Sequence, residues 1–293
     1  MRIVVHLTPE DNADVVSGRL WLAGAVGIEE QPDRLIATFA SADRADAARR
    51  ALGDLDAAIQ GAPPASEFER WRDFAEPIQV APDTVVVPAW WEGPVPVAAL
   101  TIPLDPGAAF GMGNHPTTAA LASRLRRRSA DSGRSAPGGA ILDLGCGSGL
   151  LSIVAALSGA RSVMAVDIDP EARAAAEANV DLNGVGDRVT VSGAAIADGE
   201  GAAPFDLIVA NVPVGVHEST GTTAGQLLSS SGEIWATGIT EDQVDRVIAA
   251  HEQAGAGLVP IETTDLDGEW WLVVLAVPGG QAAGGPRPLR SRS

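Results

Sequence analysis

The sequence has one cysteine, Cys146, among its 293 residues, so the chain cannot form an internal disulfide or a cysteine-based zinc cluster. Its four histidines are scattered without ligand spacing, and we therefore expect no metal site. No apolar run is long enough to cross a membrane, and the first residues, "MRIVVHLTPED", include acidic positions where a signal peptide would be continuously apolar. We expect a cytoplasmic protein with no membrane partner.

Positive charge is also scarce. The chain has 20 basic residues against 38 acidic ones, a formal net charge of -18, whereas proteins that bind a phosphate backbone usually carry a basic surface. Nucleic acid is thus a poor candidate for a direct partner, and a basic protein or an amine is a better one. Hydrophobic residues make up 46% of the chain, which is enough for a sizeable core, and we expect a monomer.

The N-terminal part predicts a small α+β unit. "RIVVHLT" and "RLIATFAS" are typical of strands, and "DNADVVSGRLWLAG" and "DRADAARRALGDL" have helical spacing. We place this unit at residues 1–63, because "QGAPPAS" follows it as a linker. Residues 64–103 would then hold an interdomain helix, "SEFERWRDFAEPI", and two strands, "TVVVPAWW" and "VAALTIPL".

Residues 104–277 form the next predicted domain, in which apolar strands alternate with alanine-rich helices from Ala140 onward. This pattern predicts an α/β fold whose mostly parallel sheet is covered on both faces. The last two strands, "GLVPIETT" and "EWWLVVLAV", are separated only by a short loop and predict an antiparallel C-terminal hairpin. Residues 278–293 have too few apolar residues to fold, so we expect a disordered tail.

The segment "ILDLGCGSGLL" predicts a glycine-rich turn between a strand and a helix. It contains Asp143, Gly145, Gly147 and Gly149, and the next predicted strand ends at Asp167. Glycines allow the backbone to approach a nucleoside, and a carboxylate at the end of the second strand can accept both ribose hydroxyls. The spacing therefore predicts a site for a nucleoside cofactor.

The position of the third glycine distinguishes between two cofactor classes. A dinucleotide fingerprint would require a glycine where this chain has Leu150, which argues against a dehydrogenase. The order D-x-G-x-G-x-G instead resembles the motif of S-adenosylmethionine-dependent methyltransferases.

The fourth predicted strand of this region, "FDLIVA", ends at Asn211. Its side-chain oxygen could accept a hydrogen bond from an amine at the edge of the sheet where ligands bind. Enzymes that methylate base amines have an aromatic residue shortly after this asparagine, but here Val212, Pro213 and Val214 follow it, so a platform for a flipped base is missing. A strand-capping role for Asn211 is the alternative.

The stretch "DPGAAFGMGNHPTT", residues 105–118, is the most specific feature in the chain. It resembles the D-P-G-x-A-F-G-T-G-x-H-x-T-T block of the ribosomal protein L-eleven methyltransferase family (PrmA), with Met112 where that block has a threonine and with Asn114 two residues later. "FERWRDFAEPIQVAPDTVVVPAWW" and "DGEWWLVVLAV" are also similar to family segments. The resemblance extends over nearly the whole chain and implies a class I methyltransferase fold with a Rossmann-like sheet.

The resemblance also implies site residues. The family's contacts to S-adenosylmethionine fall on Thr118, Gly145, Gly147, Asp167 and Asn211, and Asn211 is the candidate catalytic residue. The implied activity is methylation of lysine side chains and of the N-terminal amine of one ribosomal stalk-base protein, L-eleven, which the small N-terminal domain would recognise. Pro213 departs from the family's N-I-L-A-G pattern, so another protein, a peptide or a small amine remains an alternative substrate.

Two other hypotheses concern mechanism and class. His115 and His217 are rivals for a general base, although we expect Asn211 to orient a neutral amine without one. A catalytically silent module that docks on a ribosomal protein is a further alternative, but the complete cofactor motif argues against it.

Overall fold

The computed structural model describes residues 2–8, 16, 20, 23, 25–31, 33–39, 42–53, 55–60, 75–107, 112–131, 139–193, 204–252 and 257–278. The chain divides into two compact units, Met1–Ala75 and Glu76–Ser293. None of the helices in these ranges is long and apolar enough to span a membrane. The predicted interdomain helix and C-terminal tail fall almost entirely outside the described residues, and the division predicted at residue 63 stays a prediction.

The N-terminal unit contains a four-stranded antiparallel sheet in the order β2-β3-β1-β4. The strands are β1 (Arg2–His6), β2 (Ala25–Gln31), β3 (Arg34–Phe39) and β4 (Ala57–Gln60), and helix α2 (Ala42–Ala51) lies between β3 and β4. This order is that of a ferredoxin-like β-α-β-β-α-β unit, in which Val16 and Leu20 are helical between β1 and β2.

The prediction of two strands for this unit was incomplete. Strand β2, "AVGIEEQ", was not among the predicted strands. Its pairing with β3 shifts register between Ala25 and Gly27, so the glycine marks a bulge inside the strand. Strand β4 is an edge strand of the sheet and buries only its first residue. Its sequence therefore shows almost no alternation of apolar and polar residues.

The second unit begins with a three-stranded sheet formed by β5 (Ile78–Ala81), β6 (Thr84–Pro88) and β7 (Leu100–Leu104). The predicted strands correspond to β6 and β7, whereas β5 was missed. The apolar side of this sheet packs with the helix α4 (Pro116–Asp131) in one core cluster that includes Val86, Ile102 and Leu121. This sheet therefore supports the helix that begins within the 105–118 block.

The large sheet has seven strands in the order β10-β9-β8-β11-β12-β14-β13. Its strands are β8 (Ala140–Leu144), β9 (Ser162–Val166), β10 (Val189–Ser192), β11 (Phe205–Asn211), β12 (Leu228–Thr240), β13 (Val259–Asp265) and β14 (Trp270–Ala276). All are parallel except β14, which is antiparallel to both neighbours. The predicted α/β class, with a mostly parallel sheet and a closing hairpin, is confirmed.

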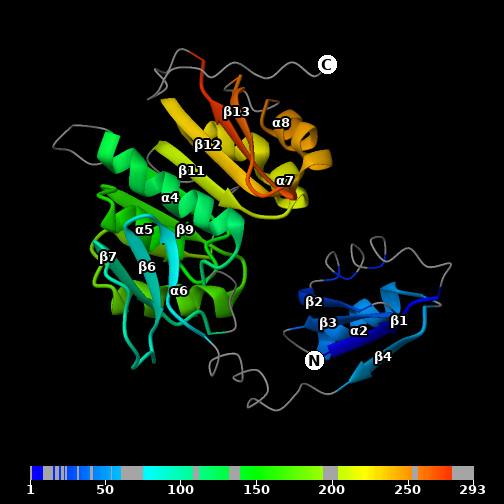
Figure 1. The fold of residues 1–293 in the computed structure, drawn as a ribbon. Coiled ribbons are helices and arrows are strands. Elements are labelled where there is room, and N and C mark those ends of the chain that lie inside the picture. The colour runs from blue at the N-terminus through cyan, green and yellow to red at the C-terminus, as the bar shows by residue number, and fades with distance from the viewer. Residues whose placement is uncertain are drawn as a thin grey trace. The chain divides into compact units, whose positions relative to one another are not determined.

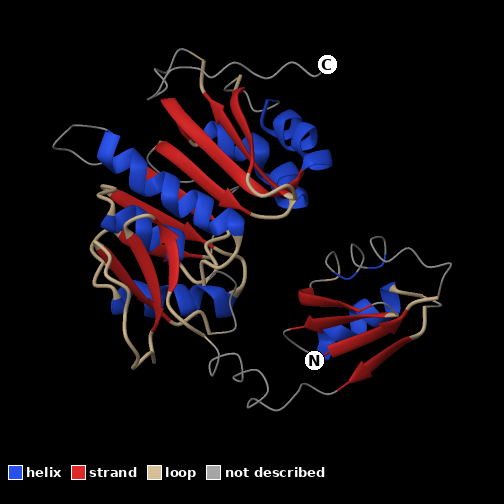
Figure 2. Cartoon of the chain, in the orientation of Figure 1, coloured by secondary structure: helices blue, strands red, loops and turns tan. Residues whose placement is uncertain are grey.

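Helices cover both faces of this sheet (Figures 1 and 2). They are α5 (Leu150–Leu157), α6 (Pro170–Leu182), α7 (Val214–Gln226) and α8 (Val244–Glu252). Successive strand residues enter opposite cores: Ile141 packs with residues of α4, α5 and α6, and Leu142 packs with residues of α7 and α8. The connections thus change face between β8 and β11, the switch point at which sheets of this kind bind ligands.

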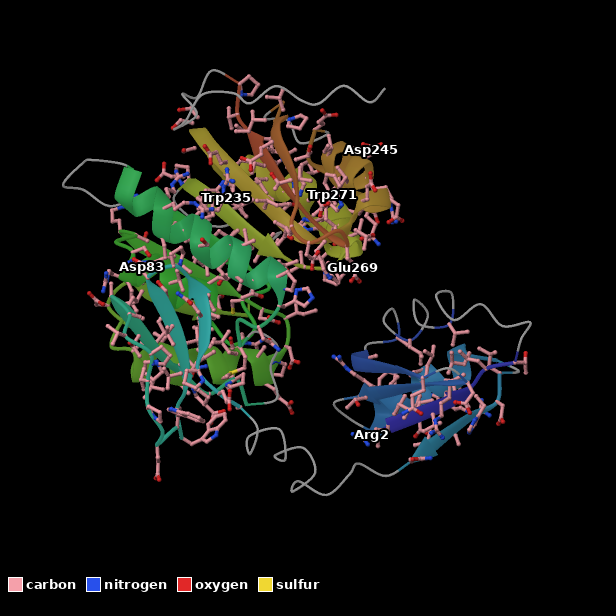
Figure 3. All side chains as sticks on the ribbon, viewed as in Figure 1. Arg2, Asp83, Trp235, Asp245, Glu269 and Trp271 are labelled. Atoms are coloured by element: carbon pink, nitrogen blue, oxygen red, sulfur yellow. The ribbon has the colours of Figure 1, made fainter. Side chains whose placement is uncertain are left out.

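Helix α4 is held against the sheet by an aromatic and ionic cluster. The guanidinium groups of Arg124 and Arg128 lie 4.8 and 5.6 Å from the ring centroid of Trp235, which Figure 3 labels on β12. Arg124 donates two hydrogen bonds to Glu262, and Arg128 donates one to Glu233. The helix that carries Thr118 is therefore fixed to the sheet.

Candidate functional site

The glycine loop connects β8 to α5 at the carboxyl edge of the sheet. Gly145, Gly147 and Gly149 have positive φ angles of 73°, 52° and 81°. A Cβ atom at Gly145 would lie 2.4 Å from Cγ1 of Val212, and one at Gly149 would lie 3.2 Å from Cα of Ala176. Backbone conformation and close packing thus both require glycine here, as the sequence pattern predicts.

Asp167 follows β9 and is partly exposed beside this loop. Its Oδ2 atom accepts a hydrogen bond of 3.0 Å from the backbone N–H of Gly147, and its Oδ1 atom accepts one of 2.9 Å from that of Asp169. Each oxygen retains a further lone pair, because a carboxylate has about four acceptor sites. The two backbone contacts fix the carboxylate while leaving it able to accept hydroxyl groups.

Asp143 plays a different part from Asp167. Its side chain is buried and accepts a hydrogen bond of 2.6 Å from Oγ of Ser152 in α5. Burial raises the pKa of Asp143 to about 6, against the opposing effect of the Ser152 hydrogen bond. Asp143 therefore ties the end of β8 to the helix after the glycine loop and is not open to a ligand.

Thr118 and Asn211 come together from segments 93 residues apart. Thr118 lies in the first turn of α4, and Asn211 is the last residue of β11. The side-chain Nδ2 atom of Asn211 donates a hydrogen bond of 3.0 Å to Oγ1 of Thr118. Because β11 pairs directly with β8, this contact lies at the same edge of the sheet as Gly145.

The residues after Asn211 are held firmly. The Val212 N–H donates a hydrogen bond of 3.2 Å to the Thr237 carbonyl, and the Val212 side chain packs beneath Gly145. Gly238 has a φ of 83°, and a Cβ atom there would lie 2.7 to 3.0 Å from backbone atoms of Val212. Pro213, which departs from the N-I-L-A-G pattern of the family, is the N-cap residue of α7. Proline is well tolerated at the start of a helix.

The two histidine candidates lie in different environments. The His115 Nδ1 atom is 2.6 Å from Oγ1 of Thr117, and its ring lies edge-on to Trp270 with 4.8 Å between centroids. Burial lowers the pKa of His115, although the nearby carboxylates of Asp267 and Glu269 act in the opposite direction. His115 is thus partly buried next to the helix that carries Thr118.

His217 is fully buried in α7. Its Nε2 atom lies 3.2 Å from the Thr237 carbonyl oxygen, and its Nδ1 atom lies 3.4 Å from Nε2 of His251. Burial lowers the pKa of each histidine to about 4. Both nitrogens of His217 face protein groups inside the core, which removes it as a base for a bound amine.

Comparisons with known proteins identify the family to which this chain belongs. The family model described as "Ribosomal protein L11 methyltransferase (PrmA)" matches residues 9–277. The chain belongs to this family. Relatives named ribosomal protein L11 methyltransferase include one from Bacillus pumilus, 34% identical over 70% of this chain and 63% of its own length, and one from Idiomarina loihiensis, 36% identical over 70% and 65%.

A solved structure of a ribosomal protein L11 methylase from Lactobacillus delbrueckii subsp. bulgaricus is also similar. It has 29% sequence identity and a TM-score of 0.56, and the match covers 69% of this chain and 98% of that one. The matches to the curated relatives named above span less than two thirds of those proteins' lengths. Membership of the PrmA family confirms the predicted class I methyltransferase fold and the predicted cofactor, S-adenosylmethionine.

The residues at the sheet edge fit that cofactor. The glycine loop presents backbone without side chains, and a Cβ atom at Gly145 could be placed only by displacing Val212. Asp167 is oriented by two backbone donors and keeps free acceptor capacity, as a ribose diol requires. The specific contacts of Thr118, Gly145, Gly147, Asp167 and Asn211 with the cofactor stay predictions.

Sequence reasoning did not single out Asn179, a buried polar residue that bonds to the glycine loop at Ser148. It lies in α6 among the buried residues Ala172, Ala176 and Val180 and is 1% exposed. An asparagine on the apolar face of a helix is unusual, because its amide must find partners inside the protein. That position on the helical pattern was the available signal.

Cys146 is buried in the core beside the glycine loop, and burial raises the pKa of its thiol. A thiol held in its neutral form is a poor nucleophile. Cys146 therefore packs in the core and is a poor candidate for a nucleophile.

Proposed function

We propose that this chain is an S-adenosylmethionine-dependent protein N-methyltransferase that methylates lysine side chains and the N-terminal amine of ribosomal protein L11. The observation that carries the proposal is the hydrogen bond between Asn211 and Thr118, which lies at the same sheet edge as the glycine loop. The names of the relatives support the choice of substrate.

The residues proposed to contact the cofactor lie at the carboxyl ends of the adjacent strands β9, β8 and β11 and at the start of α4. Gly145 and Gly147 offer open backbone to the nucleoside, Asp167 accepts the ribose hydroxyls, and Thr118 and Asn211 bind the other end of the cofactor. When bound, S-adenosylmethionine supplies an activated methyl group. The protein's task is then to hold an amine in line and exclude water.

Asn211 is the proposed residue for orienting the amine. Its Nδ2 atom is already engaged by Thr118, so its Oδ1 atom is the group left to accept a hydrogen bond from an acceptor N–H. Such a bond directs the nitrogen lone pair toward the methyl group. Pro213 adds no competing backbone N–H, because proline lacks one.

The acceptor must lose its proton before it can react. At pH 7 this costs about 4 to 5 kcal/mol for a lysine with a pKa near 10.4, but only about 1 to 1.5 kcal/mol for an N-terminal amine with a pKa near 8. Exclusion of water from the site lowers both costs, because a neutral amine tolerates burial better than a cation. We infer that no dedicated general base is needed.

The acidic composition and the N-terminal unit support a protein substrate. A net charge of -18 favours association with a basic partner and makes that association dependent on salt. The N-terminal unit, a separate compact body without any of the proposed cofactor residues, is the proposed substrate-recognition domain.

The proposal is tested with labelled S-adenosylmethionine and purified ribosomal protein L11. Mass spectrometry should show added methyl groups on lysines and on the N-terminal amine, and the Asn211→Ala variant should lose most of the transfer. A parallel incubation with a cell extract lacking L11 tests for another substrate. Label in that extract together with unmodified L11 would reject L11 as the target.

A further inference from the structure

Helix α6 contacts several of the segments that form the proposed cofactor site. At its start, the N–H of Asp169, its N-cap residue, bonds to Oδ1 of Asp167, and the Arg173 side chain donates to the Asp167 carbonyl at 3.0 Å. At its end, Asn183 donates to the Pro103 carbonyl in β7 at 2.8 Å. The helix thus spans from the ribose-binding carboxylate to the strand that leads into the 105–118 block.

Asn179 connects two of these segments from the middle of α6. Its Nδ2 group donates to the Asp105 carbonyl at 2.8 Å and to the Ser148 carbonyl at 2.9 Å. Its Oδ1 atom accepts from the Asp105 N–H at 2.9 Å. Both amide hydrogens and the oxygen are therefore used, and the partners are 74 and 31 residues away in the chain.

Both partners lie at functional positions. Asp105 is the first residue of the 105–118 block, and its own side chain accepts a hydrogen bond of 3.0 Å from the Gly107 N–H. Ser148 lies between Gly147 and Gly149 in the glycine loop. One buried amide thus holds the start of the block and the cofactor loop at a set distance from each other.

The close packing of the loop on the helix makes this contact possible. A Cβ atom at Gly149 would be 3.2 Å from both Cα and Cβ of Ala176, which lies one turn before Asn179. In this close contact the Asn179 side chain supplies two donor hydrogens and one acceptor oxygen. An apolar residue would leave the Ser148 carbonyl and both backbone groups of Asp105 without this partner.

We propose that Asn179 is a positioning residue for cofactor binding, because it fixes the glycine loop relative to the 105–118 block. This inference rests on the proposed function, in which both segments contact S-adenosylmethionine. A residue that only stabilised the fold would lower the stability of the protein without changing the cofactor affinity of the folded molecules.

The test compares Asn179→Ala with Asn183→Ala in the full chain. Asn183 is the matched control, since it lies on the same helix and bonds to β7 but not to the glycine loop. Thermal unfolding gives the folded fraction, and calorimetry gives the Kd for S-adenosylhomocysteine. We expect Asn179→Ala to raise the Kd about tenfold or more, since the loss of even one buried hydrogen bond corresponds to roughly that factor. We expect Asn183→Ala to change the Kd by less than about twofold.

Amide hydrogen exchange without cofactor supplies a second readout. The Cys146 and Gly149 amides should exchange faster in Asn179→Ala than in Asn183→Ala. If Asn179→Ala does not fold, Asn179→Asp carries the same test, because a carboxylate cannot donate to two carbonyls. Equal affinities and exchange rates in the Asn179 variant and the wild type would overturn the inference alone. Failure of the wild type to bind would overturn the proposed function as well.

Discussion

Asn211 donates a hydrogen bond of 3.0 Å from its side-chain Nδ2 atom to the hydroxyl oxygen of Thr118. The contact sets the orientation of the Asn211 amide. Its nitrogen is bonded to Thr118, and its oxygen is left as an acceptor for another group. Thr118 is only 3% exposed, so its position is set by the packing of α4. Two residues proposed to bind the same cofactor therefore also orient each other.

This orientation predicts the effect of Thr118→Val. The variant keeps the shape of the side chain but removes the acceptor, so the Asn211 amide is free to turn its NH₂ group toward the amine. We expect kcat to fall by about 10- to 100-fold, as for a misoriented catalytic group. The matched control is Thr117→Val, which removes a hydroxyl from the same helical turn without touching Asn211. Equal losses in both variants, measured with S-adenosylmethionine at saturation, would contradict the orienting role.

The glycine loop gives a second prediction, for Gly145→Ala. The change combines a left-handed backbone at φ 73° with a Cβ atom 2.4 Å from Cγ1 of Val212. We expect a loss of about 2 to 4 kcal/mol in the free energy of unfolding, of which about 1 to 2 kcal/mol comes from the backbone conformation. Urea denaturation measures the total.

Gly184 separates the two contributions. It has a φ of 63°, and nothing lies within 4 Å of its Cβ position, so Gly184→Ala reports the backbone cost alone. In a Val212→Ala background, where the clash is relieved, the cost of Gly145→Ala should fall to that of Gly184→Ala. An unchanged cost in that background would show that contact with Val212 is not the cause.

The sequence predicts this part of the fold well for a physical reason. Strands β8, β9 and β11 are largely buried and predominantly apolar, and the loop after β8 requires glycine at three positive φ angles. The N-terminal unit was harder to predict, because the edge strand β4 has one buried residue and β2 contains a bulge. Neither strand retains a clear alternation.

The sequence indicates which residues belong to the proposed site, but it does not indicate which of them contact one another. Local motifs identified Gly145, Asp167 and Asn211 because each ends a strand or follows one. The bond between Asn211 and Thr118, and the three bonds of Asn179, join segments distant in the chain, and no local pattern encodes such pairings. The burial of His217 depends on α8, which supplies His251 and packs against α7.

The buried histidine pair predicts a loss of stability in acid. Burial lowers the pKa values of His217 and His251 to about 4 from the usual 6.5. As the pH falls below 6.5, the unfolded chain therefore binds protons before the folded chain does, and stability decreases until about pH 4. We expect the contribution of this pair to the free energy of unfolding to fall by roughly a few kcal/mol over this interval, measured by urea denaturation at each pH.

Two variants test the assignment of this acid sensitivity. His251→Gln removes one titrating group and should reduce the dependence of stability on pH between 6.5 and 4. His6→Gln, which replaces an exposed histidine in β1, is the control variant for the loss of one imidazole. If His251→Gln shows the same slope as the wild type, the acid sensitivity arises from other groups.

The pH dependence of methyl transfer distinguishes between a base at His115 and no base. The pKa of His115 is lowered by burial, so a mechanism that uses it as the base should reach a plateau in kcat/KM well below the pKa of either amine. If Asn211 only orients an amine that has lost its proton to water, kcat/KM should continue to rise about tenfold per pH unit, to near 8 for an N-terminal amine and near 10 for a lysine. We expect the second profile. His115→Asn retains a nitrogen near the position of Nδ1, and we expect kcat/KM of this variant to rise with pH as in the wild type. Loss of this rise in the variant would identify His115 as the base.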